Sequence, residues 1–200
     1  MENSSDEIHR IIDGNSVDVH TDNPAEKLNY LGDPSKENTQ WYGYPTCYAV
    51  WKPSDFTDRT FKVGDQFVME PNSTFTDDTC KAKAVAPKLV MQAHSAPLDI
   101  QFSSDSKTAY ITFHGSWNRE PTTGYKVVQV PFSKSVDGGY LPSASISSVG
   151  YTDIFWNSDP SKCSTTYCFR PVSIAVDKYD RLYVSSDAAG EGEIFILGKA

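Results

Sequence analysis

Hydrophobic and polar positions along the chain form one pattern that occurs twice. Residues 97–113 and 171–184 each hold an alternating apolar stretch opened by proline, then a turn rich in Asp, Ser or Lys. A second apolar stretch follows, centred on Tyr110 in the first copy and on Tyr183 in the second. Alternation with a period of two predicts half-buried β-strands, and the polar turn predicts that each pair of strands is antiparallel.

A third predicted strand follows each pair, at residues 124–132 and 192–197, after a polar stretch that contains glycine. Residues 2–12 resemble only the end of this unit, as a comparison with residues 185–197 shows. We therefore expect the chain to begin in the middle of a repeat, with one truncated unit and two full ones.

Such a unit of short antiparallel strands cannot bury both of its faces alone. Propellers solve this problem by packing typically 4–8 sheets into a ring. Two full units and a remnant cannot close a ring, so we predict an all-β fold that is a partial β-propeller. The rest of the ring would come from an upstream half or from a second chain. The alternative is an ordinary small β-sandwich whose strands are similar by accident.

Four segments follow from this pattern: a truncated blade end at 1–12, a long insertion at 13–81, and blades at 82–144 and 145–200. Within the insertion, residues 23–32 have an asparagine cap, proline in the first turn, an early glutamate and a terminal glycine, which predicts a short helix.

Each full blade is also expected to begin with an outer strand, at residues 82–94 in the first blade and 145–154 in the second. The tract from 40 to 51 is rich in tyrosine and tryptophan. It could be an aromatic plug that seals a propeller face, or a platform for a ligand.

Composition narrows the range of partners. The net charge of −8 comes without a basic stripe, which argues against nucleic acid and against an anionic membrane surface. No apolar run approaches the ~20 residues that span a bilayer. The acidic start of the chain is not a signal peptide, but this absence is uninformative in a chain that begins within a repeat.

The cysteines favour an oxidising compartment. Their proximity in the sequence predicts two disulfides, and sequons at Asn3 and Asn72 agree with an extracellular parent protein. None of the four falls in a C-x-x-C spacing. The predicted pairs are Cys47–Cys80 and Cys163–Cys168.

Candidate binding residues lie at the ends of the repeats. His114 directly follows the second strand of one unit, Gly115 permits close approach, and Arg170 directly precedes the proline of the next unit. We expect His114 and Arg170 to share one cavity on the propeller axis, where an arginine can bind a carboxylate with two hydrogen bonds. The alternatives are a structural histidine and an arginine in a salt bridge at the rim.

Five short motifs between residues 94 and 190 carry a resemblance to a known family. The chain resembles the fungal pyrroloquinoline-quinone (PQQ)-dependent pyranose dehydrogenases and related sorbosone dehydrogenases, which are similar in turn to soluble quinoprotein glucose dehydrogenases. The motifs are His94-Ser-Ala-Pro-Leu98, Phe113-His-Gly-Ser-Trp-Asn-Arg119, Gly124-Tyr-Lys-Val-Val128, Phe169-Arg-Pro-Val172 and Ser186-Asp-Ala-Ala-Gly190.

The resemblance implies a six-bladed propeller with the quinone near its axis and a calcium ion that clamps the quinone. It also implies that His114, Trp117, Arg119 and Arg170 bind the cofactor, since cations and hydrogen-bond donors suit a planar polyanion.

A calcium site needs oxygen ligands, including main-chain carbonyls. The stretch that matches the family's calcium site is Glu2-Asn3.

In this family a histidine base takes the proton of a sugar hydroxyl while hydride passes to the quinone, and an external acceptor then takes the electrons. None of the four histidines lies in a matching context, so no catalytic residue is assigned. The resemblance thus predicts a sugar dehydrogenase whose N-terminal propeller half is missing here, and a chain that is inactive alone. The rival interpretations are a non-catalytic NHL-like binding module and a calcium-dependent propeller lactonase.

Overall fold

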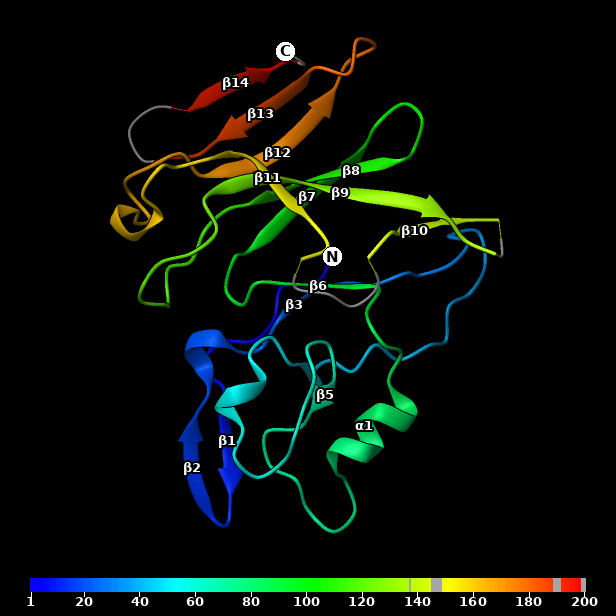
Figure 1. Cartoon of the computed structure of the whole chain (residues 1–200), viewed down its shortest axis with the longest axis vertical. Helices are drawn as coiled ribbons and strands as arrows, with labels where there is room; N and C mark the ends of the chain where they lie inside the picture. Colours follow the sequence, from blue (N-terminus) through cyan, green and yellow to red (C-terminus); the bar gives the residue numbers. More distant parts are fainter. Residues whose placement is uncertain (137, 145–148, 189–191, 199–200) are drawn as a thin grey trace. The chain divides into compact units, whose positions relative to one another are not determined.

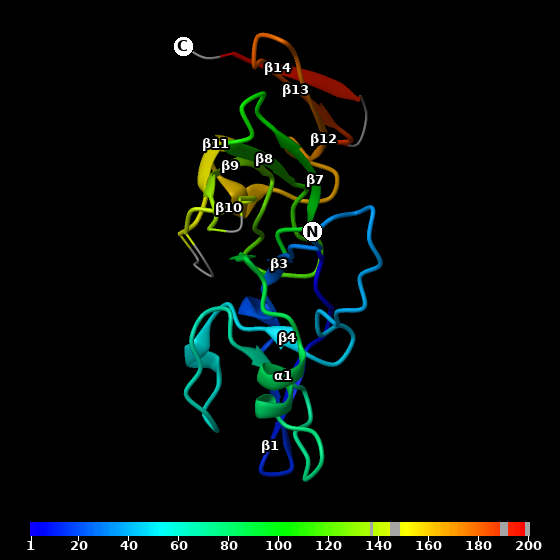
Figure 2. The ribbon, with the colours of Figure 1, turned by 90° about the vertical axis from the view of Figure 1, so that its right-hand side faces the viewer.

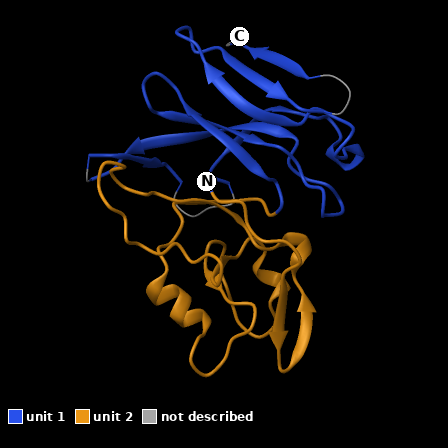
Figure 3. Cartoon of the chain, turned by 180° about the vertical axis from the view of Figure 1, so that it is seen from behind, with its two compact units in different colours: residues 1, 94–145, 149–200 blue, residues 2–93, 146–148 orange. Residues whose placement is uncertain are grey.

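A computed structural model describes residues 1–136, 138–144, 149–188 and 192–198. The chain separates into two compact units, which Figure 3 colours differently. Unit 1 holds residue 1 and the described residues from 94 onward, and unit 2 begins at residue 2 and ends at residue 93. No helix of the described part is long and apolar enough to cross a membrane.

The first sheet of unit 1 is built on three long antiparallel strands in the order β7, β8, β9 (Figure 1). These are β7 (Pro97–Phe102), β8 (Thr108–Phe113) and β9 (Lys126–Lys134). Two shorter strands, β10 (Tyr140–Pro142) and β11 (Thr152–Trp156), both pair with β9. The strand β11 therefore completes the first blade, and the prediction that residues 145–154 enter the second blade is wrong for residues 152–154, while residues 145–148 lie outside the described residues.

The second sheet of unit 1 has the order β12, β13, β14, which Figure 2 shows from the side. Its strands are β12 (Pro171–Val176), β13 (Leu182–Ser186) and β14 (Glu193–Leu197). Within the described residues this sheet has three strands, so the expectation of an outer strand that enters it is not met.

The two repeats have equivalent registers. Pro97 opens β7 and Pro171 opens β12, and the pairing with the next strand slips between the first and fourth residues of both. Tyr110 pairs with the fifth residue of β7, and Tyr183 pairs with the fifth residue of β12. The sequence repeat is therefore a structural repeat, as predicted.

The two sheets pack against each other through β12, which lies against β7 and β8. One core cluster draws residues from both repeats, including Tyr110, Val127, Ile174 and Val184. Burial of apolar side chains between adjacent sheets is what a single blade cannot achieve alone.

Polar groups fix the registry of these two sheets. Asp99 of β7 accepts hydrogen bonds from the Ser173 hydroxyl at 2.7 Å and from the Ile174 backbone N–H at 2.8 Å. The Thr112 hydroxyl donates to the carbonyl of Val172 at 2.9 Å. These bonds run sideways between neighbouring blades, so they set how far one blade can slide along the other.

Unit 2 is made of short two-stranded sheets and one α-helix within its described residues. The strand pairs are β1–β2, β3–β6 and β4–β5, all antiparallel. The bounds are β1 (His9–Ile12), β2 (Asn15–Asp18), β3 (Glu26–Leu28), β4 (Tyr48–Ala49), β5 (Gln66–Phe67), β6 (Leu89–Met91) and α1 (Asp77–Lys83). Short 3₁₀ turns lie at η1 (His20–Asp22) and η2 (Pro53–Asp55), and unit 1 holds a third, η3 (Pro160–Lys162).

The predicted helix at residues 23–32 is wrong, because this segment contains β3, which pairs with β6. The Asn23 side chain does not cap a helix; its Oδ1 accepts the backbone N–H groups of Trp51 and Lys52. All three residues of β3 are buried, so long-range pairing overrides the local helix signals.

Residues 82–94 are likewise not an outer strand of the first blade, because α1 ends at Lys83 and β6 belongs to unit 2. Residues 9–12 form a strand, but it makes a hairpin with β2. The boundaries of the four predicted segments themselves stay a prediction.

Candidate functional site

The candidate site lies between the two repeats, where the second strand of the first repeat ends and the first strand of the second repeat begins. His114 directly follows β8, and Arg170 directly precedes β12. The structure brings them together: Arg170 Nη2 lies 3.1 Å from His114 Nδ1. The expectation that these two side chains converge is therefore met, although they are far apart in the sequence.

A third residue, Asp187, extends this contact into a chain of polar groups. Its Oδ1 lies 2.8 Å from His114 Nε2. A guanidinium can only donate, so Nδ1 of His114 must accept, and the ring proton therefore sits on Nε2 and points to Asp187. Asp187 thus selects the tautomer that lets Arg170 bind the histidine.

Sequence reasoning did not single out Asp187, although a signal was present. Phe113 pairs with Pro97, and Ser186 pairs with Pro171, so the residues that follow, His114 and Asp187, are equivalent in the two repeats. An alignment of the two repeats that continued four residues past Tyr110 and Tyr183 would have paired His114 with Asp187.

Arg170 is held by the backbone around it and retains one unused donor. Its Nη1 donates to the carbonyl of Thr165 at 2.9 Å, and its backbone N–H donates to the Ser186 hydroxyl at 3.1 Å. Its Nε is buried and has no hydrogen-bond partner among the described residues. A buried donor without an acceptor is costly, so this atom favours a ligand that accepts hydrogen bonds.

The loop that carries His114 is tightly fitted against Tyr125. Gly115 has φ +105°, and a Cβ atom there would lie 2.5 Å from the Tyr125 ring. The Tyr125 hydroxyl donates to the carbonyl of Ser116 at 2.6 Å. Burial raises the pKa of Tyr125, an effect that the charge of Arg170 opposes. Tyr125 therefore stays protonated near neutral pH and serves as a support for the loop.

Trp117 and Arg119 lie on the same loop, three and five residues after His114. Trp117 is 70% exposed, which leaves its ring open to a ligand, and Arg119 is half-buried. A role of either residue in cofactor binding stays a prediction.

Glu2 and Asn3, the predicted calcium ligands, lie in unit 2. The Glu2 carboxylate is already engaged: Oε1 lies 2.6 Å from Nζ of buried Lys27, and Oε2 accepts from Asn29 at 3.0 Å. No group of three or more His, Cys, Asp or Glu among the described residues is placed to hold a metal ion. Glu2 and Asn3 do not fit a calcium ion unless the ion pair between Glu2 and Lys27 breaks. Their role as calcium ligands therefore stays a prediction.

The aromatic tract 40–51 contributes mainly to packing. Tyr48 is 3% exposed within a core cluster, and Trp41 packs edge-to-face on Phe75. Of the two interpretations, the structural one therefore fits better. Both predicted disulfides, Cys47–Cys80 and Cys163–Cys168, are confirmed.

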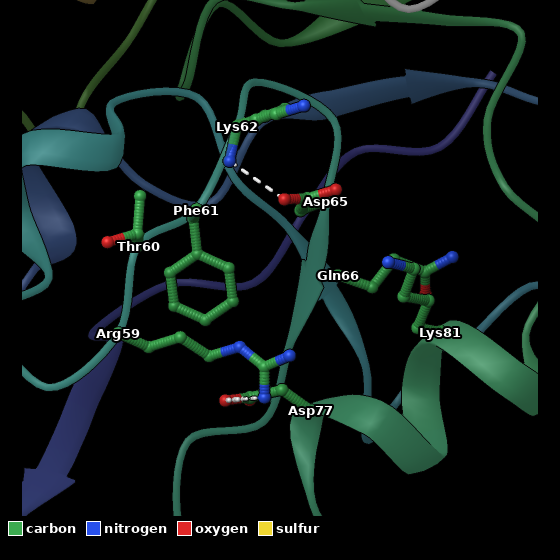
Figure 4. A pocket seen from close by; sticks show the side chains of 8 residues that line it. All are labelled: Arg59, Thr60, Phe61, Lys62, Asp65, Gln66, Asp77 and Lys81. Carbon is green, nitrogen blue, oxygen red and sulfur yellow. Dashed lines mark hydrogen bonds and ion pairs between the residues drawn. The ribbon is translucent and has the colours of Figure 1, made fainter.

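Unit 2 has a hollow of its own, of about 240 Å³ (Figure 4). Its lining includes Arg59, Lys62 and Lys81, but aspartates offset much of this charge. Arg59 pairs with Asp78, and Asp77 is bound by the buried Arg10. The hollow therefore shows no strong excess of one sign of charge, and we assign it no ligand.

The architecture and the site together define a class: two consecutive propeller-type blades with an arginine–histidine–aspartate chain at one end. Residues 1–200 match the TrAA12-like family. The chain belongs to this family.

Comparisons with individual proteins agree with this assignment. The chain is 44% identical over 204 residues to a pyrroloquinoline quinone-dependent pyranose dehydrogenase of Coprinopsis cinerea, with 98% of the chain and 28% of that protein covered. It is 41% identical over 203 residues to a pyrroloquinoline quinone-dependent sugar dehydrogenase of Hypocrea jecorina, again with 98% of the chain covered, and with 43% of that protein.

Solved structures confirm the fold. The holo form of the pyranose dehydrogenase PQQ domain from Coprinopsis cinerea matches with a TM-score of 0.90 at 44% identity, covering 96% of this chain and 49% of that one. The calcium structure of the Trichoderma reesei family AA12 enzyme matches with a TM-score of 0.86 at 40% identity, covering 99% and 48%. The chain thus spans about half the length of these domains, and the predicted resemblance and the all-β, partial-propeller fold are confirmed.

Proposed function

We propose that this chain forms part of a PQQ-dependent sugar dehydrogenase and that its Arg170–His114–Asp187 chain faces the quinone. The observation that carries the proposal is the convergence of Arg170 and His114 at one end of two adjacent blades, with Arg170 Nε buried and unused. Relatives that are more than 40% identical over nearly the whole chain and are named for this cofactor support it.

The residues present fit a planar anion with several carboxylates. Arg170 and Arg119 offer charge-assisted hydrogen bonds, which are stronger than neutral ones. The His114 ring is held in place from both sides, and the exposed Trp117 ring offers an aromatic face. When bound, PQQ would supply the hydride acceptor for oxidation of a sugar hydroxyl.

The reaction itself belongs to a longer protein in this proposal. The histidine base, the ligands of a calcium site and the surface for an external electron acceptor would come from outside this chain. The chain alone would then be inactive. Two disulfides and an exposed sequon at Asn72 support the further proposal that the whole protein is extracellular.

A chimaera tests this proposal: the chain replaces the matching part of the Coprinopsis cinerea PQQ domain. We expect the chimaera to bind PQQ, measured by titration calorimetry, and to reduce a dye with aldoses as substrates, whereas the isolated chain with PQQ, calcium and aldoses does not. A correctly folded chimaera that binds no PQQ would contradict the proposal and favour a non-catalytic binding module.

A further inference from the structure

A second hollow in unit 1 lies in the loop of residues 157–168, beside the Cys163–Cys168 disulfide. It has a volume of about 460 Å³, within the range of small-ligand pockets. Its lining is polar apart from one ring and the disulfide: Asn157, Ser158, Asp159, Lys162, Tyr167 and Cys168.

The loop is anchored directly to the candidate quinone site. Its Thr165 carbonyl accepts the hydrogen bond from Arg170 Nη1 at 2.9 Å. Asn157 donates to the carbonyls of Tyr125 and Phe169, both at 3.0 Å. The hollow is therefore held in a fixed relation to Arg170 and Tyr125 of the site already described.

The chemistry of the lining suits a neutral sugar. Tyr167 is 68% exposed, so its ring offers an apolar surface to the C–H face of a pyranose. Lys162 Nζ and the Asp159 carboxylate lie 2.9 Å apart, and both side chains remain accessible. They present a donor and an acceptor side by side with no net charge, which matches hydroxyl groups better than an anion.

We infer that this hollow is a subsite for the sugar substrate, with Tyr167 stacking on a pyranose ring and Asp159 and Lys162 bound to its hydroxyls. The inference rests on the proposed function, because it takes the ligand of this hollow to be the sugar that the quinone oxidises. It makes Tyr167 a specificity-determining residue.

The first test uses the isolated chain with D-glucose, in saturation-transfer difference NMR. We expect glucose signals from the wild type, weaker signals from Tyr167→Ala and intact signals from Tyr167→Phe. The matched control is Tyr179→Ala, since Tyr179 is 67% exposed but lies in the turn after β12, at the opposite end of that strand. No transfer from the wild type, or an equal loss in Tyr179→Ala, would overturn the subsite.

The second test introduces Tyr167→Ala into the chimaera. Because this variant loses one aromatic contact with the sugar, its KM for the aldose should rise roughly three- to tenfold. Affinity for PQQ and kcat should stay within about twofold. If PQQ binds normally and KM does not move, the subsite is wrong while the proposed function stands. If PQQ does not bind at all, the proposed function fails instead, so the two failures are distinguishable.

Discussion

His114 and Asp187 occupy the same position in two consecutive blades, and their side chains are joined at 2.8 Å. Each directly follows the second strand of its repeat. The backbone N–H of each donates to the backbone carbonyl of the residue that precedes the opening proline of the repeat. The acceptors are Ala96 for His114, at 2.9 Å, and Arg170 for Asp187, at 3.2 Å. One repeated backbone geometry thus presents a histidine in one blade and its carboxylate partner in the next.

The first prediction concerns this pair in the chimaera. Asp187→Ala removes the acceptor of the His114 proton, so the ring loses its fixed orientation and PQQ affinity should fall roughly three- to tenfold. Asp187→Asn keeps an acceptor oxygen and should restore most of the affinity, as titration calorimetry would show.

The tautomer can be checked independently in the isolated wild-type chain. Nitrogen–proton NMR correlations of the imidazole should show a proton on Nε2 of His114. A proton on Nδ1, or an Asn variant as weak as the Ala variant, would contradict the assignment.

The second prediction concerns Arg170. Arg170→Ala removes at least one charge-assisted hydrogen bond to the quinone, worth ~1.5–3 kcal/mol, or roughly ten- to a hundred-fold in affinity. A matched control is Arg181→Ala, since Arg181 pairs with Asp177 in the turn at the other end of the blade. The site assignment fails if Arg170→Ala keeps PQQ affinity within about twofold.

The part of the fold and of the candidate site that could be predicted from the sequence differs between the two units. The repeat predicted the equivalence of Pro97 with Pro171 and of Tyr110 with Tyr183, because strand periodicity and turn residues are local signals. It also predicted that His114 and Arg170 meet, because equivalent ends of neighbouring blades converge.

Unit 2 was less predictable, because its strands are stabilised by distant partners. The β3 segment has helix-like caps, yet it pairs with β6 some sixty residues later. The helix α1 did carry local signals that were overlooked: Thr76 and Thr79 form a capping box, with aspartates in the first turn and lysines in the last. The repeat indicates that Asp187 is equivalent to His114, but the contact between their side chains joins two blades and is seen only in the structure.

The third prediction concerns acid stability through Asp99. Burial alone would raise the pKa of Asp99, but hydrogen bonds from the Ile174 backbone, the Ser173 hydroxyl and the Ile100 backbone outweigh burial, so the pKa is lowered. A lowered native pKa contributes stability above the ordinary value of 3.8, and this stability is lost as the pH falls through the native pKa.

Asp99→Asn should therefore lower the unfolding free energy near pH 7 by roughly 1–3 kcal/mol. The difference from wild type should shrink below the ordinary pKa of the carboxyl, as urea titrations at several pH values would measure. An exposed residue of β14, Glu193→Gln, serves as the control. A gap that stays constant between neutral and acidic pH would count against this role of Asp99.

The fourth prediction concerns glycosylation of Asn72, which is expected if the whole protein is secreted. Its Oδ1 accepts hydrogen bonds from the backbone and hydroxyl of Thr74 and from the Phe75 backbone, while the residue stays exposed. Expression through a fungal secretory pathway should yield a glycan on Asn72, visible as a mass loss of the peptide that contains Asn72 after deglycosylation. Asn72→Gln and Thr74→Ala should abolish this loss, and Asn15→Gln, outside any sequon, should not. An unmodified Asn72 in secreted protein would contradict the prediction.

The last prediction concerns Arg10, the buried centre of unit 2. Its side chain is 1% exposed and binds Asp58, Asp77 and the carbonyl of Val68. Burial alone would lower the pKa of Arg10, but the two aspartates outweigh it and raise the pKa, so the guanidinium stays charged.

Arg10→Met should therefore destabilise unit 2 by roughly 3–5 kcal/mol, because Asp77 is left as an uncompensated buried charge. Hydrogen-exchange mass spectrometry would localise the loss to peptides from residues 2–93. Arg59→Met removes an exposed arginine that pairs mainly with Asp78 and lies 3.8 Å from Asp77, and should cost ~1 kcal/mol or less. The double variant Arg10→Met with Asp77→Leu should recover part of the loss, since it removes the unpaired charge. If Arg10→Met and Arg59→Met cost the same, the buried guanidinium is not what stabilises this unit.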